Sequence, residues 1–99
     1  MTRIWLVVIL LGVTSIAPAD QVDASLQEHY RASCKLCHAT GAMGAPRAKQ
    51  SAQWKKSLAK GMPVLLDHVK SGYGGMPPKG YCSGCSDEEF RALIEFMAN

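Results

Sequence analysis

Large apolar side chains are scarce over most of this 99-residue chain. From residue 20 to the end, Leu, Ile, Val and Phe together number only 12 of 80. Such poverty combined with a high net charge indicates disorder, but ten basic against eight acidic residues give this stretch only +2. Strand-like alternation, internal repeats and low-complexity tracts are also lacking, and the mild basic excess falls short of a nucleic-acid-binding profile. We therefore expect one small domain over 20–99 that needs a disulfide, a metal or another prosthetic group to complete its core.

The longest run of large apolar residues lies at the N-terminus. Arg3 precedes an unbroken apolar run over residues 4–11, and Ala-Pro-Ala follows at 17–19. This layout is typical of a secretory signal peptide. We expect residues 1–19 to be removed by cleavage after Ala19 and the mature protein to be periplasmic. An uncleaved membrane anchor is the alternative, but the 16 residues from 4 to 19 are fewer than the roughly 20 that a span needs.

Helix signals dominate the rest of the chain and predict an all-α fold. Ser86 and Glu89 have the spacing of a capping box, and apolar residues follow at helical intervals to Met97. After a polar lead-in from Asp20, weaker patterns predict helices over about 25–33, 51–60 (with Ser51 as its cap) and 63–71. Six of the nine residues from 72 to 80 are Gly or Pro, which excludes a helix or a central strand there.

The four cysteines form two C-x-x-C pairs, Cys34/Cys37 and Cys82/Cys85, for which three chemistries compete. A zinc site is disfavoured because 44 residues separate the pairs, against about 15–20 in typical sites. A thioredoxin-like motif wants a βαβ context that this chain lacks. His38 directly follows Cys37, however, and C-x-x-C-H is the attachment signature of c-type haem. A haem held by two thioethers and an imidazole ligand would supply the apolar surface that the core lacks. Only Cys82 and Cys85 would then remain to form a disulfide.

A six-coordinate haem needs a second iron ligand opposite His38. The candidates are Met43, Met62, Met76, Met97, His29 and His68. Met43 is too close to His38, Met62 and Met97 fall on predicted helices, and both histidines have the polar neighbours of surface residues. Met76 lies in the Gly/Pro-rich segment, where glycines permit close backbone approach and two prolines stiffen the loop. We therefore expect Met76 to be the second ligand.

These motifs resemble those of the class I c-type cytochromes, and among them the cytochrome c5 family, over essentially the whole chain after residue 19. The resemblance is carried by residues 34–38, 44–46, 54, 61–62, 75–80 and 82–86. It implies a small fold whose N- and C-terminal helices pack together around one covalent haem c. It also implies a set of site residues: His38 and Met76 as axial ligands, Cys34 and Cys37 as haem attachments, the Pro46 carbonyl as acceptor for His38, Trp54 in the haem site, and a Cys82–Cys85 disulfide.

One position departs from this resemblance. Leu26 stands four residues before Tyr30, where these cytochromes usually carry a glycine that lets the first and last helices approach closely. We therefore expect looser packing around Tyr30 and Phe90, or a shift of these helices, without consequence for the iron ligands.

Two protein ligands on the iron favour electron transfer, because a substrate could reach the metal only by displacing Met76. The expected function is a soluble electron carrier rather than an enzyme, a monomer or weak dimer that exchanges electrons with redox partner proteins. Alternatives are a haem enzyme of peroxidase or small-molecule oxidase type, a haem subunit of a larger redox complex, and a thiol-redox module. Lysines 49, 55, 56, 60 and 79 form either an ordinary solvated face or a docking surface for an acidic partner.

Overall fold

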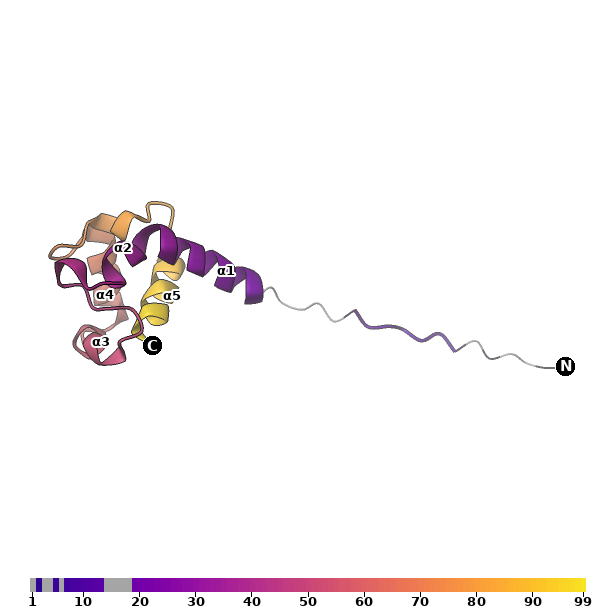
Figure 1. The fold of residues 1–99 in the computed structure, drawn as a ribbon. Coiled ribbons are helices and arrows are strands. Elements are labelled where there is room, and N and C mark those ends of the chain that lie inside the picture. Colours follow the sequence, from indigo (N-terminus) through magenta and orange to yellow (C-terminus); the bar gives the residue numbers. More distant parts are fainter. Residues whose placement is uncertain (1, 3–4, 6, 14–18) are drawn as a thin grey trace.

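The structure, a computed structural model, describes residues 2, 5, 7–13 and 19–99. Residues 7–13 form no helix, are exposed, and run away from the helical part of the chain (Figure 1). Of the predicted cleavage motif, residues 17 and 18 lie outside the described residues, and Ala19 is the first residue of a helix. Among the helices of the described ranges, none combines the length and the hydrophobicity that crossing a membrane requires.

The first helical segment is longer than the sequence patterns predict. Three elements follow one another without a break: α1 (Ala19–His29), the π-helical turn η1 (Tyr30–Cys34) and α2 (Lys35–His38). The residues at both junctions keep right-handed helical dihedral angles. The expected polar lead-in up to Ser25 and the expected end at Ser33 are therefore wrong. The physical reason is that 19–38 contains neither Gly nor Pro, so no residue in this stretch interrupts a helix.

Shorter elements make up the rest of the described fold. They are η2 (Ala42–Gly44), α3 (Ser51–Leu58), α4 (Met62–Ser71), η3 (Pro78–Tyr81) and α5 (Asp87–Ala98), where η2 and η3 are 3-10 turns. Ser51 is the first residue of α3 and not its cap, because Gln50 occupies the cap position. The segment 72–80 was expected to be free of helix, but η3 begins inside it. The described residues contain one isolated β-bridge, between Tyr73 and Met76, and no β-strand. The all-α prediction is therefore confirmed.

Helix α5 begins at the predicted capping box. The Glu89 backbone N–H donates to Ser86 Oγ at 3.2 Å, and the Ser86 N–H donates to Glu89 Oε1 at 3.1 Å. These reciprocal bonds satisfy two amide groups that the first turn of a helix leaves unpaired. The helix then turns its apolar face, from Phe90 to Met97, toward the other elements.

The core is built on this face of α5 in two clusters. One contains Trp54, Leu65, Ile94, Met97 and Ala98, and the other contains Cys82, Phe90 and Leu93. Tyr30 packs against both clusters and meets the ring of Phe96 edge-on, with 5.3 Å between the ring centroids. Leu26 packs against the cluster that contains Phe90, and Phe90 is only 3% exposed. Phe90 is thus closely packed with Leu26 in the place of the glycine.

Leu93 is the most deeply buried side chain of this core, with 1% of its surface exposed. We expect Leu93→Ala to lower the free energy of unfolding by about 2–5 kcal/mol, because the lost transfer energy adds to the cost of the cavity left behind. Urea titration followed by circular dichroism measures this loss. The matched control is Leu58→Ala, since Leu58 is 43% exposed; equal losses in the two variants would contradict the assignment of Leu93 to the core.

Candidate functional site

An apolar cavity of about 290 Å³ lies between α2, α4, α5 and the loops around residues 42–46 and 73–77. The structure brings to its walls six residues that the sequence singles out from separate segments. They are Cys34, Cys37, His38, Pro46, Trp54 and Met76. Residues up to 42 positions apart in the chain thus share one site.

The first wall of the cavity is the helix that carries the C-x-x-C-H motif. Positions i, i+3 and i+4 lie on one helix face, so Cys34, Cys37 and His38 all reach the same cavity. Both thiols are free. Burial raises the pKa of the Cys34 thiol, an effect that its hydrogen bond with the Ser33 side chain partly opposes. Cys34 in the bare polypeptide is therefore a thiol rather than a thiolate near neutral pH.

The His38 ring is fixed in one orientation by its neighbours. Its Nδ1 lies 2.7 Å from the Pro46 carbonyl oxygen. Because a carbonyl can only accept, Nδ1 carries a proton, and the lone pair of the neutral ring is then on Nε2. Nε2 has no hydrogen-bond partner among the described residues and is accessible from the cavity. An imidazole held in this way presents a basic nitrogen to a metal.

Trp54 supports the same ring from the side. The indole stacks on His38 with 5.5 Å between centroids and 24° between planes, and its Nε1–H donates to the Arg47 carbonyl at 2.9 Å. The His38 carbonyl in turn accepts the Ala48 N–H at 2.7 Å. The segment after α2 is thus tied to both ends of His38, which keeps the ring in place.

Met76 enters the cavity from a tight turn. The backbone of Met76 exchanges two hydrogen bonds with that of Tyr73, at 3.0 and 2.9 Å. Gly80 closes over the side chain, because a Cβ at this position would lie 2.9 Å from Met76 Cε. The backbone after the turn is strained, with positive φ at Lys79 and Tyr81, a conformation that non-glycine residues adopt only where surrounding structure enforces it. The Met76 thioether is consequently held within narrow limits.

The other methionines considered as ligands occupy different surroundings. Met43 is 77% exposed at the cavity edge, whereas Met97 is 4% exposed within the core. Met62 packs against the core cluster of Trp54.

The two histidines expected at the surface are both partly buried instead. His68 lines the cavity and stacks on Tyr73, with 3.9 Å between the ring centroids. His29 lies away from the cavity, between α5 and the second cysteine pair, and both of its ring nitrogens have partners. The sequence carries no local signal for either contact, because each joins residues whose proximity depends on how the helices pack.

The second C-x-x-C pair lies outside the cavity. Cys82 and Cys85 are joined by a disulfide in the turn between η3 and α5, with 5.5 Å between their Cα atoms. Cys82 is buried against Phe90 and Leu93. The two C-x-x-C pairs therefore differ in setting: Cys34 and Cys37 line the cavity, whereas Cys82 and Cys85 are joined to each other outside it.

Comparison with known proteins gives similarities to a family model, to a curated relative and to two solved structures. Residues 21–97 match the family model described as "Cytochrome C oxidase, cbb3-type, subunit III". Cytochrome c5 of Azotobacter vinelandii is 46% identical over 67 residues, which cover 66% of this chain and 81% of that protein. A mono-heme ferrocytochrome c from Shewanella putrefaciens has a TM-score of 0.66 at 42% identity, over 74% of this chain and 90% of that one. A cytochrome c crystallised in an electron transfer complex with nitrite reductase also has a TM-score of 0.66, at 31% identity, over 85% of this chain and 95% of that one.

The helical fold and the thiol-lined cavity are those of a small c-type cytochrome. Within that class, the chain belongs to the cytochrome c5 family. Its cofactor is accordingly one covalently bound haem c, and the residues present fit this group. Two free thiols and an unpaired imidazole nitrogen converge on a mostly apolar cavity, which is the donor set that haem attachment and iron ligation require.

Proposed function

We propose that this protein is a periplasmic one-electron carrier whose haem is attached through Cys34 and Cys37 and ligated by His38 and Met76. When bound, the haem supplies an iron that alternates between the ferric and ferrous states. The observation that carries the proposal is the placement of the Met76 side chain in the same cavity as the C-x-x-C-H residues. A nitrogen and a thioether as axial ligands favour the reduced state.

The chain's own residues do three things in this role. The Pro46 carbonyl holds the proton on His38 Nδ1, so the other nitrogen stays available as a ligand. The Gly80 backbone confines Met76, which keeps a weak ligand in place and leaves no coordination position for a substrate. The mostly apolar lining would leave little water around a bound haem, which limits solvent reorganisation when the charge changes. This favours a carrier over a haem enzyme.

Partner proteins would meet the carrier where the cavity approaches the surface. Tyr73 is 55% exposed at the cavity wall, and Lys60 Nζ lies 4.6 Å from its ring centroid and 3.2 Å from its hydroxyl oxygen. Lys79, three residues after Met76 in the chain, is also exposed. The similarity to a cytochrome c in complex with nitrite reductase supports a protein partner. We infer that the lysines meet an acidic surface, for which electron-transfer rates should fall as salt rises; a flat salt dependence would reject this.

A haem subunit of a larger redox complex is the second candidate, because the matching family model is described as an oxidase subunit. The match covers 81% of the length of the similar cytochrome c5, so that protein is itself a small chain. This supports a separate small carrier. The test is a reduced-minus-oxidised spectrum with a redox titration of the exported protein, followed by carbon monoxide addition to the ferrous form. We expect one reversible one-electron transition and no carbon monoxide complex at neutral pH. Ready carbon monoxide binding would show an open iron site and favour the enzyme.

Export itself is proposed from the N-terminal sequence alone. The mass of the protein recovered from the periplasm of a bacterial host should correspond to residues 20–99 with one haem. Retention of residues 1–19 in the purified protein would overturn the cleavage.

A further inference from the structure

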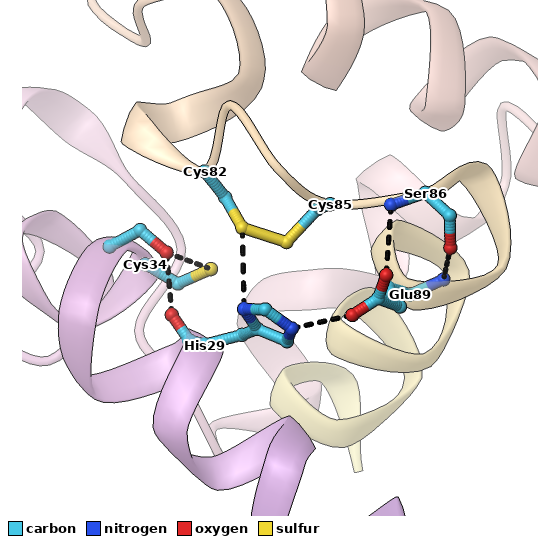
Figure 2. Close-up of polar contacts among 7 residues, drawn as sticks. His29, Cys34, Cys82, Cys85, Ser86 and Glu89 are labelled. Carbon is cyan, nitrogen blue, oxygen red and sulfur yellow. Dashed lines mark hydrogen bonds and ion pairs between the residues drawn. A yellow bond between two sulfur atoms is a disulfide. The ribbon is translucent and has the colours of Figure 1, made fainter.

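A second chemically equipped cluster lies on the side of α5 near its first turn, apart from the haem cavity. His29, at the end of α1, points at the disulfide that joins Cys82 and Cys85, and Glu89 of α5 lies on the other side of the ring (Figure 2). The His29 nitrogen and the two sulfur atoms all lie within 4.8 Å of one another. Nothing in the haem chemistry uses these residues.

The His29 ring is held by both of its nitrogens. Nε2 lies 2.5 Å from Glu89 Oε2, and Nδ1 lies 3.7 Å from Cys82 Sγ. The Glu89 carboxylate is itself anchored by the capping box. Its pKa is held below the usual range, mainly by the hydrogen bond from the Ser86 backbone, then by that with the Ser86 side chain, and also by the nearby His29. Glu89 is thus ionised near neutral pH, so Nε2 donates to it and Nδ1 faces the sulfur.

The two sulfurs of the disulfide differ in their surroundings. Cys82 is only 7% exposed, packed against Phe90 and Leu93 and faced by His29. Cys85 is half-buried, and the residues between the two cysteines are exposed. Gly84 has open space where a side chain would stand. An external thiol can therefore approach Cys85, while Cys82 is placed as the leaving group.

We propose that Cys82–Cys85 is a thiol–disulfide exchange site that accepts electrons from dithiols, with His29 as its proton donor and Glu89 as the residue that positions His29. One thiolate of the dithiol attacks Cys85 Sγ and forms a mixed disulfide as the Cys82–Cys85 bond breaks. The bonding electron pair leaves on Cys82 Sγ, which takes the Nδ1 proton of His29 in its imidazolium form, while Nε2–H stays bound to Glu89. The second thiolate of the dithiol then attacks its own sulfur of the mixed disulfide, and Cys85 is released and takes a proton from water. The dithiol releases two protons to water on forming its two thiolates, and His29 recovers one proton from water. The net change is the transfer of two electrons and two protons from the dithiol to the protein disulfide.

A disulfide that only stiffens the turn before α5 needs no histidine beside it. Two features of this disulfide, the neighbouring His29 and its position before α5, instead favour exchange. Exchange is faster when the leaving thiolate is stabilised, which a proton on Nδ1 accomplishes directly. The pair also precedes the first turn of the 12-residue helix α5, whose N-terminus favours a thiolate. In the reverse direction His29 accepts the proton of the Cys82 thiol, so the same group serves both reduction and oxidation.

The test uses the holoprotein with its haem iron already reduced by ascorbate, so that the iron consumes no electrons from the dithiol. Dithiothreitol is added without oxygen, samples are quenched with iodoacetamide, and the alkylated thiols are counted by mass. We expect two thiols to appear, and His29→Gln to slow their appearance about tenfold or more, which is modest for positioned proton transfer. Oxidised dithiothreitol added to the reduced protein should re-form the disulfide, slowed by the same factor in His29→Gln.

Because His29 acts on the rates alone, the final ratio of disulfide to dithiol in a mixed dithiothreitol buffer should be the same in both proteins. If His29 had only a structural role, His29→Gln would shift this ratio, and the rates of reduction and of re-oxidation would change by different factors. Either that pattern, or a wild-type disulfide that does not react while the haem spectrum stays native, would overturn the proposal. The count concerns only Cys82 and Cys85, so its result is independent of the ligands of the iron.

Glu89 is tested against its neighbour in the first turn of α5. Glu89→Gln removes the charge that holds His29, while a glutamine keeps the capping box. Glu88→Gln removes the same charge from an exposed position and serves as the matched control. We expect Glu89→Gln to slow both directions of exchange and Glu88→Gln to leave them unchanged. Equal slowing in the two variants would show a general charge effect and overturn the positioning role.

Discussion

Met76→Ala is expected to abolish the sulfur-to-iron charge-transfer band of the ferric protein and to lower its reduction potential. The thioether is the group that the turn at Tyr73 and the backbone of Gly80 hold in the cavity, and alanine offers the iron no donor atom. The loss of a sulfur ligand removes a factor that favours ferrous iron. The ferrous variant should also bind carbon monoxide, because one axial position is then open. Absorption spectra and a redox titration measure all three changes.

The controls for this prediction are two methionines that the structure places in the core or against it. Met62 packs against the Trp54 cluster, and Met97 is 4% exposed on α5. We expect Met62→Leu and Met97→Leu to keep the charge-transfer band, since swaps of similar volume disturb a core little. A band that survives in Met76→Ala but disappears in either leucine variant would refute the ligand assignment.

The haem site is more predictable from the sequence than the fold around it, for a physical reason. Cys34, Cys37 and His38 are ordered by covalent chemistry that fixes their spacing, and the glycines and prolines near Met76 act through local backbone conformation. Both kinds of signal survive in a linear reading of the chain. The start of α1 at Ala19 was missed because polar residues gave no apolar periodicity, although nothing there interrupts a helix.

The contacts of His29 and His68 could not be derived in this way. Each histidine carries charged or polar neighbours in the sequence, and that pattern predicts a surface position. Their partners come from elsewhere: Glu89 and Cys82 lie on or beside α5, and Tyr73 lies beyond the end of α4. Which helix faces meet depends on the whole core. In this protein the core depends on a group that is not part of the polypeptide.

The double variant Cys34→Ala/Cys37→Ala is expected to lose covalent haem and most of its helical structure together. If the fold persisted without the cofactor, a cavity of about 290 Å³ would stand open between α2, α4 and α5. At about 24 cal/mol per Å³ of closed cavity, this volume sets an upper bound of about 7 kcal/mol on the penalty, because the cavity is partly open to water. That is comparable to the entire stability of a domain of this size, which is about 4–12 kcal/mol at typical values per residue. The scarcity of large apolar residues leaves nothing to refill the space.

The measurements are far-UV circular dichroism and a pyridine haemochrome spectrum of the purified variant, with Cys82→Ser/Cys85→Ser as the matched control. That control also removes two cysteines, but it leaves the cavity thiols in place and should retain covalent haem. The chain-entropy contribution of a disulfide with so short a loop is only about 2 kcal/mol, so most of its helix content should remain. A haem-free Cys34→Ala/Cys37→Ala protein with the circular dichroism of the holoprotein would show that the two apolar clusters suffice by themselves. The haem would then occupy the core without being needed for the fold.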